Sequence, residues 1–221
     1  MQLSELFYSL SGEGPSVGRP AIFIRMSKCN RNCAGCDTKI KDRVEEIEPS
    51  AVISRVKNYL KVHPHSRVIF TGGEPLLQPD AINQIIDGLP GVPCDIETNG
   101  TLDSQIELFK RLNIIVVSPK KDMFKSSKEI DEFFRKWTLI SEQGRHNVYF
   151  KLVIGNLPWA WNEREISTVI SNCPSLTNRI WLMPAGDNAE KLSISARNCW
   201  RAVMHLGCNY SDRLHIRTNS K

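Results

Sequence analysis

Residues 21–38 read AIFIRMSKCNRNCAGCDT and decide the fold. Residues 21–26 are apolar apart from Arg25 and include two isoleucines, which predicts a buried strand. The strand runs into a loop, residues 27–38, with a Cys-x3-Cys-x2-Cys arrangement formed by Cys29, Cys33 and Cys36. Spacings this short let one loop bring three sulfur atoms to one metal centre. A cuboidal 4Fe-4S cluster normally takes four thiolates, so three would leave one iron open, which is typical of a metal site that does chemistry.

The alternative for this loop is a zinc site. Its fourth ligand would come from a histidine or from one of the other four cysteines, Cys94, Cys173, Cys199 and Cys208. Zinc loops usually pair their cysteines in two separate arms, and the sequence has no second arm. The four scattered cysteines are more typical of small buried apolar residues. Because the total of seven is odd and no export signal is recognisable, we expect reduced thiols and no disulfide framework.

Beyond this stretch, short β-branched runs alternate with longer segments of helical period. The alternation predicts an α/β protein in which parallel strands are joined by crossover helices. The expected strands are residues 21–26, 68–70, 94–97, 114–118, 148–154, 180–183 and 214–216. The expected helices are residues 50–60, 80–89, 104–112, 127–140, 163–171 and 193–205. In right-handed winding the loops after the strands gather on one face, where such sheets bind their ligands.

The ends of the helices also carry sequence signals. Ser50, Asp80 and Ser104 are the expected N-caps of the first three helices, and Gly207 is expected to end the last one. No internal repeat, low-complexity tract or linker rich in Pro, Gly and Ser divides the chain. Residues 1–221 are therefore predicted to form a single domain.

Composition and charge exclude several classes of protein. With 221 residues, 41% of them hydrophobic and 24% charged, the chain is neither disordered, collagenous nor a coiled-coil rod. The net charge of +5 suits an anionic ligand, but no basic stretch is interleaved with aromatic residues, so direct binding of nucleic acid is not expected. No apolar run reaches the ~20 residues of a membrane span, and the N-terminus lacks the basic region of a targeting signal. The expected location is the cytoplasm.

Further polar motifs follow the later strands. After the second strand, residues 71–75 read TGGEP, in which two glycines let the backbone approach a ligand and Glu74 offers an acceptor for an ammonium group. Residues 97–101, ETNGT, follow the third strand, and residues 118–120, SPK, follow the fourth. Each motif alone could be an ordinary turn. Their shared position at strand ends places them on the predicted ligand face.

The cysteine loop together with the TGGEP motif resembles the radical S-adenosylmethionine (radical SAM) superfamily, whose open iron binds the amino and carboxylate groups of that cofactor. This resemblance implies a partial, modified (β/α)6 barrel. Upstream, residues 10–14, LSGEG, and Arg25 combine with residues 36–38, CDT, into a pattern that resembles one family, the 7-carboxy-7-deazaguanine synthases. The match is dense from about residue 5 to residue 38 and thin between Asp122 and Arg213.

The resemblance implies a role for each matching position. Substrate contacts are implied for Leu10, Ser11 and Gly12, largely through backbone, for Glu13, Thr71 and Glu97, and for Arg25, as a bidentate partner of the substrate carboxylate. Cofactor contacts are implied for Gly35, Cys36, Asp37, Gly73, Glu74, Asn99, Ser118, Pro119 and Lys120. Metal ligands are implied to be Cys29, Cys33 and Cys36 for the 4Fe-4S cluster and Thr38 for Mg²⁺, which binds hydroxyl oxygen while keeping most of its waters.

The chain departs from the family pattern in three places. Ser11 stands where the family commonly has Gln, and Gly35 stands where it has an aromatic residue; backbone contacts would survive both changes. Near the C-terminus the family often shows Leu-Gln-Pro and Gln-Thr-His-Lys, whereas this chain has LMP at residues 182–184 and RTNSK at residues 217–221, with Asn219 where the family often has His. Because this C-terminal end would close over the substrate, its different sequence is also compatible with a related substrate. The cations of the C-terminal tail, Arg213, Arg217 and Lys221, could reach an anion or belong to a frayed terminus.

The family resemblance implies a lyase of 7-deazapurine (queuosine) biosynthesis. The enzyme would convert 6-carboxy-5,6,7,8-tetrahydropterin to 7-carboxy-7-deazaguanine with loss of ammonia. One electron from the cluster would cleave S-adenosylmethionine, and the resulting 5'-deoxyadenosyl radical would take a hydrogen from the carbon that bears the carboxylate. The family also implies a homodimer and a reductant such as flavodoxin or ferredoxin. The alternatives are an activase that installs a glycyl radical on a partner enzyme, and a non-catalytic zinc or iron-sulfur module.

Overall fold

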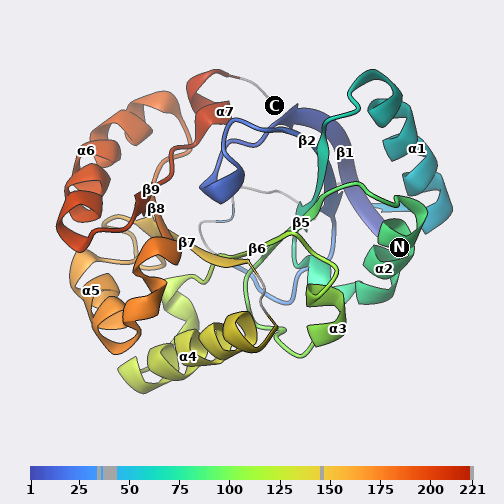
Figure 1. Cartoon of the computed structure of the whole chain (residues 1–221). Coiled ribbons are helices and arrows are strands. Elements are labelled where there is room, and N and C mark those ends of the chain that lie inside the picture. Colours follow the sequence, from blue (N-terminus) through green and yellow to red (C-terminus); the bar gives the residue numbers. More distant parts are fainter. Residues whose placement is uncertain (34–35, 37–43, 145–146, 220–221) are drawn as a thin grey trace. The chain divides into compact units, whose positions relative to one another are not determined.

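A computed structural model describes residues 1–33, 36, 44–144 and 147–219. The chain divides into two compact units (Figure 1). The first contains residues 1–11 and 19–115, and the second contains residues 12–18 and 116–221. Strand β6 (Ile114–Val117) runs across the boundary between them. The prediction that residues 1–221 form a single radical SAM domain stays a prediction.

The first unit is built on parallel strands that carry the motif loops. Strands β2 (Pro20–Met26), β4 (Arg67–Gly72) and β5 (Cys94–Thr98) pair in parallel, so that Ile24 faces Phe70 and Phe70 faces Ile96. All three side chains are fully buried. The predicted strands 21–26, 68–70 and 94–97 are therefore confirmed, and their β-branched runs are the buried centre of a sheet, as expected for parallel strands.

Two further strands of this unit carry no strong sequence signal. Strand β1 (Gln2–Leu10) pairs antiparallel with β2, and the short β3 (Glu45–Glu46) pairs antiparallel with β1. Most side chains of β1 are only half-buried, because the strand lies toward the edge of the order β3-β1-β2-β4-β5. A half-buried strand of mixed polarity lacks the continuous apolar run by which the central strands were recognised.

The helices of the first unit are α1 (Pro49–Val62), α2 (Pro79–Gly88) and α3 (Ile106–Phe109), with a 3₁₀ turn, η3, at Pro75–Leu77. The predicted N-caps Ser50, Asp80 and Ser104 are wrong, since the cap positions are held by Glu48, Gln78 and Gln105. For α1 and α2 the reason is a proline at the first helical position, which needs no N–H partner and starts the helix earlier.

The second unit repeats the strand and helix alternation. Strands β7 (Val148–Ile154), β8 (Ile180–Pro184) and β9 (Asn209–Tyr210) pair in parallel, with crossover helices between them. Its helices are α4 (Ser127–Gly144), α5 (Glu163–Asn172), α6 (Ala189–Leu206) and α7 (Leu214–Arg217). Its 3₁₀ turns are η1 (Gly14–Ser16), η4 (Lys121–Met123) and η5 (Pro174–Arg179). Gly207 ends α6 with a positive φ of 68°, which confirms the predicted C-cap.

The predicted strand at residues 214–216 is wrong. These residues form the one-turn helix α7, closed by the hydrogen bond from Thr218 N–H to the Leu214 carbonyl, and the last strand is β9 instead. A three-residue pattern of alternating polarity is too short to separate a strand from a helical turn. The backbone of Leu214 donates to the Gly12 carbonyl at 3.0 Å, so the segment is fixed by a tertiary contact that the local sequence does not encode.

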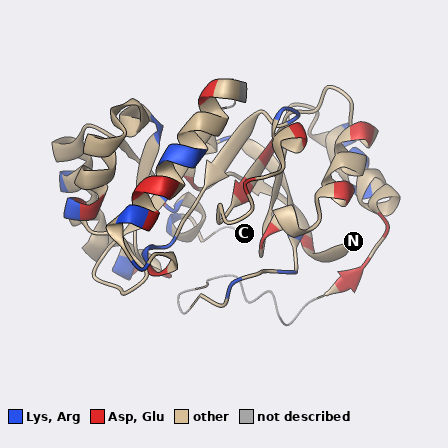
Figure 2. Ribbon diagram, turned by 90° about the horizontal axis from the view of Figure 1, so that it is seen from below, with Lys and Arg blue, Asp and Glu red and all other residues tan. Residues whose placement is uncertain are grey.

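Charged residues of both signs are interspersed along the helices (Figure 2). An example is the pair Lys128 and Glu132 on α4, whose side-chain atoms lie 3.8 Å apart and which are largely exposed. Exposed pairs of this kind contribute little to the free energy of unfolding, so the buried apolar side chains dominate stability. Within the described residues no helix is both long and apolar enough to span a membrane.

Candidate active site

The cysteine loop follows β2 directly. Cys29 and Cys36 are exposed, Cys33 is half-buried, and all the cysteines of the chain are free thiols. Cys36 N–H donates a backbone hydrogen bond to the Cys33 carbonyl at 3.2 Å. Burial raises the pKa of Cys29, and the charges of Glu74, Cys33 and Cys36 raise it further. The described residues contain no group of three or more His, Cys, Asp or Glu side chains arranged to hold a metal ion.

The two glycines after β4 pack against the start of the cysteine loop. Gly73 N–H donates to the Met26 carbonyl at 2.9 Å, and Glu74 N–H donates to the Lys28 carbonyl at 2.7 Å. A Cβ atom on Gly73 would stand 2.0 Å from the Lys28 carbonyl oxygen, and one on Gly72, whose φ is +121°, would stand 2.2 Å from that of Met26. Only glycine fits at either position. The motif therefore sets the path of the loop that carries the thiols.

The carboxylate of Glu74 joins two of the motif loops. The residue is completely buried. One oxygen accepts hydrogen bonds from Leu76 N–H at 3.1 Å and from the Thr98 hydroxyl at 2.8 Å, and the other accepts from Asn99 N–H at 2.8 Å. Burial raises the pKa of Glu74, while these three hydrogen bonds oppose the rise. The side chain thus ties the loop at residues 97–101 to the glycine turn.

Asn99 connects the same loop to the cysteines. Its side-chain amide donates to the side-chain oxygen Oδ1 of Asn30 at 2.9 Å, and the side-chain amide of Asn30 donates to the Thr101 hydroxyl at 2.8 Å. Asn30 lies next to Cys29 in the sequence and was not among the predicted site residues. The three motifs that follow β2, β4 and β5 are therefore joined by hydrogen bonds, as their shared position at strand ends predicted.

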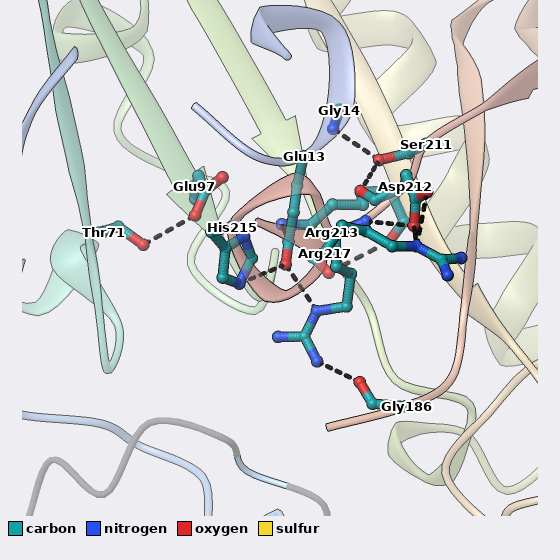
Figure 3. A network of polar contacts seen from close by, with 12 residues as sticks. Glu13, Gly14, Thr71, Glu97, Gly186, Ser211, Asp212, Arg213, His215 and Arg217 are labelled. Carbon is teal, nitrogen blue, oxygen red and sulfur yellow. Dashed lines mark hydrogen bonds and ion pairs between the residues drawn. The ribbon is translucent and has the colours of Figure 1, made fainter. Parts of the chain in front are cut away.

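The predicted substrate residues of the first unit lie on neighbouring strands. Arg25 of β2 is the register partner of Thr71 of β4, and the Thr71 hydroxyl donates to Glu97 at 2.8 Å (Figure 3). The Arg25 guanidinium lies over the Phe7 ring at 5.6 Å, and its Nε donates to a carboxylate oxygen of Glu5 at 3.1 Å. No sequence signal pointed to Glu5, because β1 itself was not predicted.

The other predicted substrate residues of the first unit are Leu10 and Ser11, the last two residues before the boundary between the units. Leu10, at the end of β1, has 49% of its surface exposed, and Ser11 is buried with its N–H donating to the Arg19 carbonyl at 2.8 Å. The predicted residues Gly35, Asp37 and Thr38 lie outside the described residues, so the implied magnesium ligand has no structural description.

In the second unit Glu13 is the centre of a buried ionic network (Figure 3). One carboxylate oxygen lies 2.6 Å from Lys151 Nζ, and the other lies 2.9 Å from Arg213 Nε and 3.8 Å from His215 Nε2. Although burial by itself would raise the pKa of Glu13, the positive charges of Lys151 and Arg213 lower it well below its usual value. Lys151 and His215 were missed at the sequence level because they belong to no recognisable motif.

Two tryptophans, Trp159 and Trp161, contact the loop that follows β6. The Pro119 carbonyl accepts a 2.9 Å hydrogen bond from the indole N–H of Trp161, a completely buried side chain. Lys120 Nζ lies 6.0 Å from the centre of the Trp159 ring, and the Ser118 hydroxyl donates to the Lys151 carbonyl at 3.1 Å. Two hydrogen bonds and one cation–π contact within the second unit therefore fix Ser118, Pro119 and Lys120.

We expect Trp161→Phe to lower the free energy of unfolding by about 2 kcal/mol, because it leaves the buried Pro119 carbonyl without its donor. Trp181→Phe is the matched control, since the buried indole nitrogen of Trp181 has no hydrogen-bond partner among the described residues and its removal should cost less than about 1 kcal/mol. Urea unfolding followed by circular dichroism measures both. Equal losses in the two variants would show that the hydrogen bond to Pro119 contributes nothing.

Comparison with known proteins identifies the family. The model of the radical SAM superfamily matches residues 23–138, which is more than half of the chain. The chain belongs to the radical SAM superfamily. The matched part begins in β2 and includes the cysteine loop, the glycine turn and the loop after β5. The predicted recognition of this superfamily is confirmed.

Relatives that are named for their activity match this radical SAM protein over more than half of its length. The 7-carboxy-7-deazaguanine synthase of Hyperthermus butylicus is 29% identical over 98% of this chain and 92% of its own length. That of Bacteroides thetaiotaomicron is 38% identical over 59% of this chain and 67% of its own length. The crystal structure of QueE from Escherichia coli superimposes with a TM-score of 0.59 and 22% identity, covering 97% of this chain and 94% of that one. The predicted radical SAM type of α/β fold is confirmed.

Membership of the radical SAM superfamily implies a 4Fe-4S cluster and S-adenosylmethionine. The donor set fits both groups, because three free thiols lie on one loop and the glycine backbone packs directly against that loop. Cys29, Cys33 and Cys36 would hold the cluster, which supplies the electron that cleaves the cofactor. Membership of the superfamily favours this assignment over the alternative zinc site.

Proposed function

We propose that this radical SAM enzyme is a 7-carboxy-7-deazaguanine synthase, a lyase that converts 6-carboxy-5,6,7,8-tetrahydropterin to 7-carboxy-7-deazaguanine with loss of ammonia. The observation that carries the proposal is the match over 98% of this chain to relatives that bear this name. Within the first unit, the residues implied to contact substrate, Arg25, Thr71 and Glu97, lie together on neighbouring strands.

Each of these residues has a chemical task in the proposed reaction. Arg25 pairs with the carboxylate of the pterin, while Glu5, bonded to Nε, and the Phe7 ring, which lies against the guanidinium, orient the group. The hydrogen bond between Thr71 and Glu97 fixes both side chains for polar contacts to the ring. These residues bind and orient the substrate, and the difficult bond changes belong to the cofactor.

The remaining assignments extend this proposal to cofactors and partners. Gly73, Glu74, Asn99 and the Ser118–Lys120 loop bind S-adenosylmethionine, with Gly73 and Glu74 acting through the backbone because the Glu74 carboxylate is already engaged by three donors. Thr38 binds Mg²⁺, which neutralises substrate carboxylate charge. The partners are the small pterin, a reductant such as flavodoxin or ferredoxin, and a second copy of the chain in a homodimer.

We expect Arg25→Gln to raise KM for the carboxy-tetrahydropterin about 100-fold, because a charge-assisted bidentate contact is lost. Arg25→Lys should recover little of this loss, since a lysine cannot reproduce the planar fork of a guanidinium. Arg55→Gln is the control, because Arg55 is an exposed arginine of the same unit that pairs with Glu45. Steady-state kinetics under anaerobic conditions measure all three. An unchanged KM in Arg25→Gln would show that Arg25 does not bind the substrate carboxylate.

An anaerobic assay tests the proposed function directly. The reconstituted protein is supplied with the carboxy-tetrahydropterin, S-adenosylmethionine, a reductant and Mg²⁺, and 5'-deoxyadenosine and the deazapurine are read by mass spectrometry. Formation of both supports the proposal. Cofactor cleavage without deazapurine would keep the superfamily and reject the substrate, and modification of a glycine in an added partner enzyme would point to an activase instead.

A further inference from the structure

The carboxylate of Glu13 is directed at the protein's own cations. Its two oxygens are taken separately, one by Lys151 at 2.6 Å and the other by Arg213 at 2.9 Å, and all three side chains are at least 85% buried. His215 adds a third nitrogen at 3.8 Å. A carboxylate that is bonded at both oxygens by buried cations is oriented by the scaffold. This arrangement differs from the substrate contact that the family resemblance implied for Glu13.

The backbone around Glu13 is bonded to the same C-terminal segment. Gly14 N–H donates to the Ser211 hydroxyl at 2.8 Å, and the Gly12 carbonyl accepts from Leu214 N–H at 3.0 Å. At Gly12 a Cβ atom would stand 2.3 Å from the His215 ring nitrogen Nδ1, so the imidazole ring packs directly on the glycine backbone. Gly12, Glu13 and Gly14 are thus each bonded to a residue of the segment 211–215.

The C-terminal segment is in turn anchored to the rest of the second unit. The Arg213 guanidinium donates to the Gly186 carbonyl at 2.7 Å, after β8 (Figure 3), and the Arg217 guanidinium donates to the Ser193 hydroxyl of α6 at 2.8 Å. Ser211 N–H also donates to the Leu182 carbonyl at 2.8 Å. The alternative of a frayed terminus is therefore wrong for residues 211–218, which are folded by contacts to β8 and to Glu13.

We propose that Glu13 is a positioning residue. Its ion pair with Arg213 clamps residues 211–217 onto Gly12–Gly14, and its ion pair with Lys151 ties the same carboxylate to β7, so that the backbone at Gly12 is held ready for the substrate. This inference rests on the proposed function. Arg213 is the partner of Glu13 in this clamp, and the His215 ring packs on the backbone of Gly12. Neither Glu13 nor Arg213 takes part in the chemical step.

Kinetics of a double-mutant cycle test the clamp. In Glu13→Gln the two cations lose their counter-charge, and in Arg213→Gln the carboxylate loses one partner. We expect each single variant to raise KM for the carboxy-tetrahydropterin at least tenfold with kcat changed less than threefold. The double variant should show a smaller rise than the product of the two single effects, because an amide pair replaces an ion pair. Arg213→Lys, which keeps the charge, should stay within threefold of the wild-type KM.

Glu163→Gln is the matched control, since Glu163 also forms an ion pair in the same unit, but its side chain is only half-buried and its partner His205 is exposed. Its KM should equal that of the wild type. A fall in kcat at unchanged KM in Glu13→Gln would place Glu13 in the chemical step and overturn the proposal. Unchanged values of both constants would overturn it as well.

Hydrogen exchange separates the clamp from the proposed function. Glu13→Gln should increase exchange of the backbone amides in residues 211–217 at least tenfold, whereas Glu163→Gln should leave it unchanged. Equal exchange in Glu13→Gln and wild type would overturn the clamp. A wild-type enzyme that does not turn over the pterin would overturn the proposed function, and the exchange experiment would still confirm or reject the clamp.

Discussion

Cys33→Ala is expected to lose the iron-sulfur cluster and to reduce cleavage of S-adenosylmethionine to background. In the proposed site, three thiolates on one loop are the whole protein ligand set, so two cannot retain a four-iron cluster. Iron and sulfide analysis after anaerobic reconstitution should fall from about four of each per chain to below one. The brown colour of the protein should disappear together with 5'-deoxyadenosine formation.

Cys208→Ala is the matched control for this change. Cys208 is half-buried like Cys33 but lies outside the cysteine loop, and burial raises the pKa of its thiol to about 11, which disfavours the thiolate that a metal needs. This variant should keep the cluster and the activity. A wild-type protein that takes up one zinc and no iron would contradict the assignment, and so would a Cys33→Ala variant that keeps about four irons.

Glu74→Ala should lower the free energy of unfolding by about 4 kcal/mol, because three buried donors then lose their acceptor and a cavity forms in place of the side chain. Glu74→Gln is the sharper variant. One oxygen of the amide still accepts from Leu76 and Thr98, but its NH₂ group faces the N–H of Asn99, so a donor meets a donor. We expect a loss of about 2 kcal/mol for this variant. Urea unfolding of the reconstituted protein measures both.

The control for Glu74 is Glu107→Gln, at an exposed carboxylate of the same unit that pairs with Lys110. It should change the free energy of unfolding by less than about 0.5 kcal/mol. Glu74→Gln should also weaken binding of S-adenosylmethionine, because Glu74 connects the glycine turn to the loop at Asn99. Wild-type stability in Glu74→Gln would show that the carboxylate does not hold the two loops together.

The buried strands could be predicted from the sequence because parallel strands covered on both faces are nearly continuous apolar runs. Residues 148–154 were predicted with the bounds that the structure has, and residues 180–183 fell one residue short. Strand β1 was missed because it is half-buried, and residues 214–216 were misjudged because their conformation is set by contact with Gly12. The pattern of apolar residues along the sequence indicates which elements are buried. It does not identify an element that is short or partly exposed.

The cysteine spacing, the glycine turn and their places after strands were fixed by local sequence, because ligand spacing on one loop and close backbone approach are short-range requirements. The partners of Glu74 and Glu13 were decided only by the tertiary structure. Glu13 meets Lys151 and Arg213 from 138 and 200 residues further along the chain. Whether a carboxylate faces a substrate or a buried cation depends on which distant strands and turns surround it, and no local pattern contains that information.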